Sequence, residues 1–354
     1  MIARQPAPKP LVSVVVPAWN EAPIVEKHLA TLYAFMKSLE DEYRWELIFI
    51  NDGSADDTGD LAEAFSKTRE NIHVLHHRVN AGLGRALQSA FRQCRGDYIV
   101  TLDLDLSYSA DHISELLRRI RDTGAKVVVA SPYMKGGTVS NVPWLRWTLS
   151  KWANRFLSMS VRGRVSTLTG MVRIYDGRFL KALNLRASGK EINPEILFKA
   201  MLLDAKIEEV PAHLNWQPRK AEKMRRAHMN ALRYTTSILV SGFLFRPVMF
   251  FMLPGLALLA FSLYVNTWGL IHFFRHYQTF HQYAWFPSRA SAAAAAAYAQ
   301  APHTVVVGLL SLTLAIQLIG LGILALQSKS YFEEMFHLVL SASGVVREEK
   351  SDVA

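Results

Sequence analysis

The strongest constraint on the fold of this chain comes from two long segments near its C-terminus that contain no charged residue. They cover residues 248–270 and 305–326. As a helix, each would be about 35 Å long, which is enough to cross the hydrocarbon core of a bilayer. We therefore expect a membrane region at 248–327, with two transmembrane helices joined by an outer loop. Pro254 and Gly255 lie inside the first segment and predict a kink there.

The distribution of basic residues orients this membrane region. The outer loop holds only Arg275 and Arg289 as basic residues, whereas the flanking segments are rich in Arg and Lys. By the positive-inside rule, both termini and the part of the chain before the membrane region face the cytoplasm. We therefore expect an integral membrane protein of the cell inner membrane or, in a eukaryote, of the endoplasmic reticulum. Residues 328–354 form a cytoplasmic tail in this arrangement, and the alanine run 292–297 is interpreted as low-complexity filler of the outer loop.

The net charge of +10 indicates an anionic partner. Much of the excess lies directly before the first membrane segment, at Arg219, Lys220, Lys223, Arg225, Arg226, Arg233 and Arg246. Basic residues beside a bilayer favour membrane lipids over nucleic acid. The one cysteine, Cys94, cannot form an internal disulfide, which is compatible with a reducing compartment.

The N-terminal part has the alternating pattern of an α/β protein. Apolar, β-branched runs predict strands, and segments with helical spacing of apolar residues predict helices between them. The expected strands are 11–16, 45–50, 72–76 and 98–102, and the expected helices are 21–39, 57–67 and 84–93. This alternation predicts right-handed crossovers and a mostly parallel sheet, with ligands bound at the carboxyl ends of the strands. We assign residues 1–225 to this domain.

Two aspartates at the end of the fourth expected strand are the candidate metal site. Asp103 and Asp105 flank Leu104 directly after the apolar run 98–102. Carboxylates in this position are a common way to hold a divalent cation against a diphosphate. The alternative is a solvated turn at the end of the strand.

Residues 144–161 predict a helix that lies in the membrane interface. The segment combines Trp144, Trp147 and Trp152 with basic residues, a composition that suits the headgroup region. The alternative is a core helix with a solvated basic face. Residues 226–247 form a second, juxtamembrane amphipathic segment.

Several motifs occur in the order typical of one enzyme family. The segments 15–21, 51–58 and 78–84, followed by the aspartate pair, resemble the start of family 2 glycosyltransferases. The later segments 132–137, 169–173 and 195–211 resemble its polyprenyl-phosphate branch, which includes dolichol-phosphate mannose synthases. The resemblance covers about residues 11–225 by motif and the rest by architecture. It implies a GT-A-type nucleotide-sugar-binding head followed by a two-helix transmembrane hairpin.

The resemblance also implies roles for individual residues on the donor side. Asp105 would be the principal ligand of Mg²⁺ or Mn²⁺, and Asp103 would contact the metal or the ribose. Ser107 stands where the mannose synthases have a metal-binding glutamine, so water can take that coordination position. The nucleotide-sugar pocket would comprise Pro17, Trp19, Glu21, Asp52, Asp103, Leu104 and Lys223. Asn51 replaces a frequent aspartate, and the alternative for 51–54 is a plain turn before a helix.

A polyprenyl phosphate acceptor is already anionic, so it needs cations that position it rather than a base. Arg146 matches a phosphate-contacting arginine of the family, and its alternative role is to reach the lipid headgroups. The family's second arginine falls at Pro132, so Lys135 or Arg173 are the candidates to replace it.

Together these observations predict a metal-dependent inverting transfer of one sugar from a UDP- or GDP-sugar to polyprenyl phosphate at the cytoplasmic leaflet. The competing interpretations are a processive polysaccharide synthase, a catalytically inactive membrane scaffold and a membrane-tethered oxidoreductase. The last is disfavoured because Leu87 occupies the third glycine position of the pair Gly82-x-Gly84. The expected partners are the donor, the lipid acceptor and membrane lipids, and the spans are compatible with a homo-oligomer.

Overall fold

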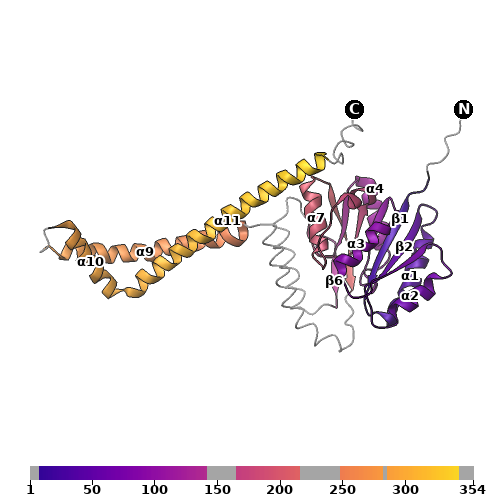
Figure 1. Ribbon diagram of the computed structural model, residues 1–354, viewed down its shortest axis with the longest axis horizontal. Helices are drawn as coiled ribbons and strands as arrows, with labels where there is room; N and C mark the ends of the chain where they lie inside the picture. Colours follow the sequence, from indigo (N-terminus) through magenta and orange to yellow (C-terminus); the bar gives the residue numbers. More distant parts are fainter. Residues whose placement is uncertain (1–7, 142–164, 216–247, 282–284, 343–354) are drawn as a thin grey trace. The chain divides into compact units, whose positions relative to one another are not determined.

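The computed structural model describes residues 8–141, 165–215, 248–281 and 285–342. The chain divides into two compact units, Met1–Ser241 and Gly242–Ala354, which are treated separately below (Figure 1). The division falls inside the segment 226–247 that we expected to link the head to the membrane region.

A seven-stranded sheet forms the centre of the first unit, with the strand order β3-β2-β1-β4-β7-β5-β8. Adjacent strands are parallel except at β7, which is antiparallel to both β4 and β5, so the expectation of a mostly parallel sheet is confirmed. The strands are β1 (Leu11–Ala18), β2 (Arg44–Asn51), β3 (Ile72–His76), β4 (Tyr98–Thr101), β5 (Val127–Ser131), β7 (Arg173–Asp176) and β8 (Ile207–Pro211). A separate pair joins β6 (Thr138–Ser140) to β9 (His213–Asn215).

The first strand extends beyond its expected end at residue 16. It continues through Pro17, which is in register with Ile50 of β2. Val15 is the last residue of β1 that pairs with β4. Pro17 therefore lies past the end of that neighbour, and its missing N–H interrupts no hydrogen bond to β4.

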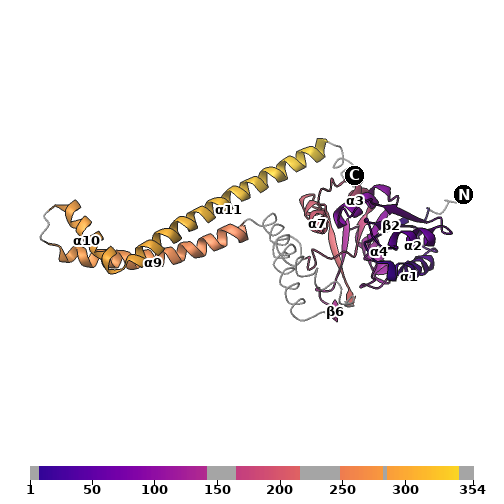
Figure 2. The same cartoon turned by 60° about the horizontal axis from the view of Figure 1, so that its bottom comes forward.

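Helices cover both faces of the sheet (Figures 1 and 2). On one face, α1 (Val25–Ser38), α2 (Thr58–Ser66) and α4 (His112–Thr123) pack in a cluster that contains Val14 and Val16. On the other face, α3 (Leu83–Gln93), α6 (Gly177–Ala182) and α7 (Ile192–Leu202) pack in a cluster that contains Val15. Successive residues of a strand point to opposite faces, so a continuous run of valines supplies both clusters. The expected helix 21–39 begins with a short 3₁₀ turn, Ala22–Ile24.

The second unit contains two helices that are long and apolar enough to cross a membrane, Phe250–Thr279 and Pro302–Ser328. They belong to α9 (Leu253–Thr279), which follows a π-helical turn at Val248–Met252, and to α11 (Pro302–Ala342). Pro254 lies in the first turn of α9, where a proline breaks no α-helical hydrogen bond. Pro254 thus marks the change from π- to α-helical geometry at the start of α9, and the kink that we expected inside this helix stays a prediction.

The alanine run corrects our interpretation of the outer loop. Residues 292–297 lie within α10 (Phe286–Gln300), and Ala293 and Ala297 are buried. Alanine has the highest helix propensity and needs little space, so this run forms a packed helix and is not filler.

Small and polar side chains join α9 to α11. The Ser262 hydroxyl donates a hydrogen bond to the Gly308 carbonyl at 3.0 Å, and the Asn266 amide donates to the same carbonyl at 3.1 Å. A side chain at Gly255 would meet the Ile319 backbone nitrogen at 3.2 Å. Glycine thus permits the close helix approach that is typical of membrane hairpins.

Candidate active site

Three neighbouring strands bring the candidate donor residues to one edge of the sheet. The order β2-β1-β4 places the segments that follow these strands side by side, about 5 Å from one strand to the next. Trp19 follows β1, Asp52 follows β2 and Asp103 follows β4. The structure therefore places Trp19, Asp52 and Asp103 at the same edge of the sheet.

Hydrogen bonds tie the segment after β1 to the segment after β2. The Asn20 side-chain oxygen accepts from the Ala55 N–H at 2.8 Å, and the Asn20 N–H donates to the Ser54 hydroxyl at 3.0 Å. The Glu21 N–H donates to the Thr58 hydroxyl at 2.7 Å. Asn20 adopts a left-handed backbone conformation with φ of 53°, which asparagine tolerates better than most residues. These contacts hold Trp19, which is 42% exposed, at the rim of the site.

The acidic pair is fixed by the residue between its members. Leu104 is buried in the core, and its carbonyl accepts a hydrogen bond from His28 Nδ1 at 2.7 Å. Any contact of Leu104 with the nucleotide would therefore use its backbone N–H, because its side chain and its carbonyl are both occupied inside the protein. Asp103 and Asp105 lie on either side and are only partly buried. The buried leucine therefore sets the orientation of both carboxylates.

Ser107 contacts Asp105 directly. Asp105 Oδ1 accepts hydrogen bonds from the Ser107 N–H at 3.0 Å and from the Ser107 hydroxyl. No group of three or more His, Cys, Asp or Glu residues that could hold a metal occurs in the described parts of the chain. Two carboxylates that rely on substrate phosphates and water for the remaining ligands suit Mg²⁺ or Mn²⁺ better than a cation that requires a closed protein cage. The oxygen donors present therefore fit the expected metal.

Tyr108 is a neighbour of this pair that the sequence pattern did not identify. Its phenol is buried, and burial together with the negative charge of Asp103 raises the pKa of Tyr108. The phenol therefore stays protonated beside the acidic pair at physiological pH.

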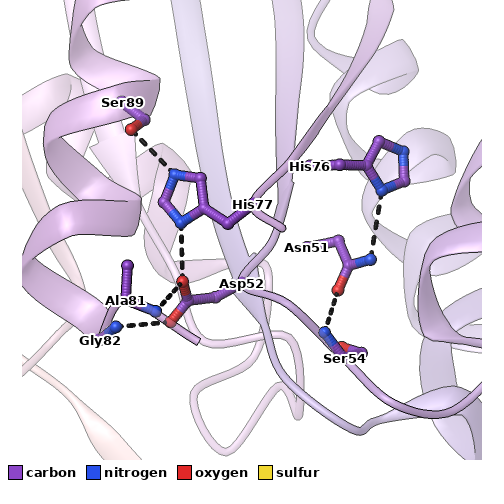
Figure 3. A network of polar contacts seen from close by, with 8 residues as sticks. All are labelled: Asn51, Asp52, Ser54, His76, His77, Ala81, Gly82 and Ser89. Carbon is purple, nitrogen blue, oxygen red and sulfur yellow. Dashed lines mark hydrogen bonds and ion pairs between the residues drawn. The ribbon is translucent and has the colours of Figure 1, made fainter. Parts of the chain in front are cut away.

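The Asp52 carboxylate is directed at the segment after β3 and not at solvent (Figure 3). Its Oδ1 atom lies 2.7 Å from His77 Nδ1 and accepts from the Ala81 N–H at 3.0 Å, and its Oδ2 atom accepts from the Gly82 N–H at 2.9 Å. The other ring nitrogen of His77 lies 2.9 Å from the Ser89 hydroxyl of α3. Asp52 is 4% exposed, so in this structure its carboxylate organises the protein rather than an exposed binding surface.

The side-chain amide of Asn51 uses both its acceptor and its donor in hydrogen bonds to neighbouring residues. The Asn51 side-chain oxygen accepts from the Ser54 N–H at 3.0 Å, and its nitrogen lies 3.2 Å from His76 Nδ1 (Figure 3). His76 Nε2 in turn lies 3.0 Å from Glu63 Oε1. Only an amide offers both a donor and an acceptor here, which explains why asparagine replaces the frequent aspartate.

Gly82 and Gly84 permit a close approach of two chain segments. Gly82 has φ of +91°, and a side chain there would lie 2.7 Å from the Ser188 carbonyl. A side chain at Gly84 would lie 2.1 Å from the Ala187 carbonyl. The glycines are therefore required by packing against residues 187–188, and a dinucleotide loop is not needed to explain them.

The structure corrects the acceptor role expected for Arg173. This residue is fully buried, and its guanidinium donates hydrogen bonds to the carbonyls of Gly170, Asn193 and Leu168. It fastens the turn before β7 to α7 and has no face open to a lipid phosphate. Lys135 is exposed in the segment after β5.

The remaining expectations for the acceptor side fall outside the described residues. These are Arg146, Lys223, the interfacial helix 144–161 and the amphipathic segment 226–247.

The sheet, its two helical layers and the acidic pair after β4 define the GT-A class of nucleotide-sugar transferases. The fold is similar to that of glucosyl-3-phosphoglycerate synthase from Mycobacterium tuberculosis, solved with Mn²⁺, UDP and phosphoglyceric acid. That likeness has a TM-score of 0.51 and 19% identity and covers 66% of this chain and 78% of the other. Residues 13–183 match the sequence profile described as Glycosyl transferase family 2.

The curated relatives agree with this class. A dolichyl-phosphate beta-glucosyltransferase of Trichomonas vaginalis is 30% identical over 231 residues, which is 60% of this chain and 68% of the relative. A polyprenol monophosphomannose synthase of Mycolicibacterium smegmatis is 32% identical over 172 residues, or 47% of this chain and 64% of the relative. A dolichol-phosphate mannosyltransferase of Pyrococcus furiosus is 27% identical, and the match covers 60% of this chain and 59% of the relative.

The chain belongs to glycosyltransferase family 2. The expected resemblance to its polyprenyl-phosphate branch is confirmed by these relatives. The matched part spans roughly three fifths to two thirds of their length, namely 64%, 68% and 59%.

Proposed function

We propose that this protein transfers a single sugar from a nucleotide sugar to a polyprenyl phosphate, with inversion at the anomeric carbon. The observation that carries the proposal is the acidic pair Asp103 and Asp105 at the carboxyl end of β4, in a chain that also has two helices of membrane-spanning length. The relatives that act on dolichyl or polyprenyl phosphate support the choice of acceptor.

Different residues on the donor side would bind the metal and the nucleoside. Asp105 and Asp103 would hold a divalent cation, which supplies charge stabilisation for the departing nucleoside diphosphate when it is bound. Ser107 holds the Asp105 carboxylate in one orientation through its hydrogen bonds. Trp19 and Glu21, in the segment fastened to residues 54–58, would contact the nucleoside.

The acceptor side needs no base. The phosphate oxygen of the lipid is anionic at neutral pH, so it forms the new bond to the anomeric carbon without losing a proton to the protein. The nucleoside diphosphate leaves with the electron pair of the old bond, from the opposite side of the carbon. Arg146 and Lys135 would position the phosphate. Lys223 or one of its basic neighbours Arg219, Lys220 and Arg225 would contact the donor phosphates.

The two apolar helices would keep the head beside the acceptor, whose prenyl chain is confined to the bilayer. The scarcity of basic residues between the helices favours a head and termini in the cytoplasm. A product made there is a lipid-linked monosaccharide.

A transfer assay in liposomes tests the proposal. Undecaprenyl phosphate, Mg²⁺ or Mn²⁺ and a panel of labelled UDP- and GDP-sugars would be incubated with the wild type and with Asp105→Asn. We expect one labelled lipid that carries a single sugar from the wild type, and at least about a hundredfold less from Asp105→Asn.

The matched control is Asp41→Asn, which makes the same chemical change at an exposed aspartate before β2, at the other end of the strand, and should retain full activity. Production of a polymer would instead indicate a processive synthase. Absence of product with every donor, together with nucleotide-sugar binding that Asp105→Asn leaves unchanged, would support the inactive scaffold.

A further inference from the structure

A basic pocket is formed by residues of α3 and of the segment after β3, next to Asp52. Its volume is about 400 Å³, and its lining includes His77, Arg78, Arg85, Ser89 and Arg92. None of Trp19, Glu21, Asp103 or Asp105 lines it. The metal and sugar chemistry proposed above therefore leaves this pocket without a role.

The helix itself gathers part of this lining. Arg85, Ser89 and Arg92 recur at intervals of four and three residues, so they share one face of α3. The opposite face, with Leu87 and Phe91, is buried against the sheet. A basic outer face is common on helices, and alone it would indicate only solvated charges. Here the basic face of α3 lines a pocket, so its side chains can surround a small anion.

The three arginines of the pocket lack protein acceptors. Within the described parts of the chain, the guanidinium groups of Arg78, Arg85 and Arg92 make no side-chain hydrogen bond or ion pair. Some other arginines of the same unit have such partners, as Arg119 does in its ion pair with Glu208 at 2.8 Å. Others, such as Arg118 and Arg178, are exposed on helices that do not line the pocket. Three like charges around one pocket repel each other unless an anion joins them. The pocket therefore has the positive charge and the hydrogen-bond donors that an anion requires, and within the described residues no carboxylate pairs with these arginines.

The acidic residues closest to the pocket are already occupied. Glu63 pairs with His76 at the edge of the pocket, and Asp52 accepts hydrogen bonds from His77 and from the N–H groups of residues 81 and 82. The contacts from Asp52 to His77 and from His77 to Ser89, which Figure 3 shows, join two residues of the pocket lining. The Ser89 hydroxyl is thereby held against the other ring nitrogen of His77, so the donors that remain for an anion are the guanidinium groups.

We propose that this pocket binds a phosphate group, separately from the donor and acceptor sites of sugar transfer. Arginine guanidiniums match the oxygen geometry of phosphate, and three of them more than offset the charge of a doubly charged anion. The same group can come from a free phosphate or from the headgroup of an anionic lipid. This inference does not rest on the proposed sugar transfer, because neither the acidic pair Asp103 and Asp105 nor Trp19 and Glu21 line the pocket. Asp52, which the sequence pattern assigned to the donor, contacts the lining residue His77.

Titration of the full-length protein in detergent tests the site. Inorganic phosphate would be added in the presence of EDTA, with binding followed by calorimetry and by hydrogen–deuterium exchange of residues 76–93. The test variant is Arg85→Gln with Arg92→Gln. The control is Arg118→Gln with Arg178→Gln, which removes the same charge from two exposed helical arginines outside the pocket.

We expect phosphate to protect residues 76–93 in the wild type and in the control. In the test variant, affinity at this site should fall at least about tenfold, since charge-assisted hydrogen bonds are lost. Dioctanoyl phosphatidic acid, titrated in parallel, distinguishes the two sources. Tighter binding than inorganic phosphate identifies a lipid headgroup, and equal or weaker binding identifies a free phosphate.

Two results would overturn the inference. One is the lack of protection in residues 76–93 at millimolar phosphate. The other is equal binding by the test and control variants, which would mean that the phosphate binds elsewhere. Neither result depends on sugar transfer, so failure of the transfer assay and failure of this site are separable. A melting temperature of the test variant close to that of the control would exclude misfolding as the cause of lost binding.

Discussion

His77 Nδ1 lies 2.7 Å from Asp52 Oδ1, and this contact joins the ends of β2 and β3. Two backbone N–H groups at positions 81 and 82 complete the contacts of the same carboxylate. The Asp52 carboxylate thus holds the segment between the end of β3 and the start of α3. Loss of this carboxylate should lower the stability of the fold at this edge of the sheet.

We predict that Asp52→Asn destabilises the protein by about 1–3 kcal/mol. The asparagine nitrogen would face a backbone N–H, so at least one hydrogen bond is lost and one donor is left without an acceptor. Thermal unfolding in detergent measures the effect. Asp41→Asn, at an exposed position in the turn before β2, should leave the melting temperature unchanged. An equal loss in both variants would contradict the assigned role of Asp52.

Ser107 should influence metal affinity through Asp105. In Ser107→Ala the carboxylate loses the hydroxyl that orients it. We expect the Mg²⁺ concentration for half-maximal transfer to rise about tenfold, as is typical when a partner of a metal ligand is removed. The control is Ser109→Ala, whose hydroxyl lies near His112 and not near the acidic pair. Identical metal titrations for both variants would refute this prediction.

Glu46 should make stability depend on pH. Burial alone would raise the pKa of Glu46, but hydrogen bonds from Ser13 and Arg95 and the charge of Arg95 hold it below the ordinary value of 4.5. A lowered pKa means that the folded state favours the ionised form. The resulting stabilisation is present above the ordinary pKa and is lost as pH falls through the folded pKa.

We therefore expect Glu46→Gln to cost about 1–3 kcal/mol at pH 7. The difference from the wild type should shrink as pH falls below about 4.5. Chemical unfolding at several pH values measures this difference. Glu115→Gln, at an exposed site on α4, serves as control and should show neither effect. A constant difference between Glu46→Gln and the wild type from pH 7 to pH 3 would contradict the ionised state of Glu46.

The membrane hairpin offers a matched pair of glycines on α9. Gly255 faces the backbone of α11 at Ile319, whereas Gly269 has no atom within 4 Å of the position of a side chain. We expect Gly255→Leu to separate the helices and destabilise the hairpin by about 1–3 kcal/mol. Gly269→Leu should be neutral or slightly stabilising, since leucine favours a helix more than glycine does. Thermal unfolding in detergent compares them, and similar melting temperatures would contradict this packing.

Local patterns predicted most of the elements that form the site. Runs of β-branched residues marked β1 to β4 to within two residues at their ends, because a buried strand needs a continuous apolar sequence. The acidic pair was also recognisable, since Asp103 and Asp105 directly follow such a run. The helix α10 was missed because an alanine run in a loop carries no periodic pattern from which its packing could be inferred.

The roles of buried polar residues could not be predicted in this way. Arg173 looked like a cation for the acceptor, yet its guanidinium is satisfied by carbonyls at 168, 170 and 193. Asp52 looked like a contact for the nucleotide base, yet its oxygens hold His77 and the turn at 81–82.

The sequence by itself determined the alternation of strands and helices, the two membrane-length helices and the position of the acidic pair. These features depend on hydrophobicity and propensity over short stretches of chain. Only the tertiary structure decided which polar groups face a ligand and which are satisfied inside the protein. A buried donor or acceptor must find a partner, and folding brings that partner from distant parts of the chain, as Ser89 is brought to His77.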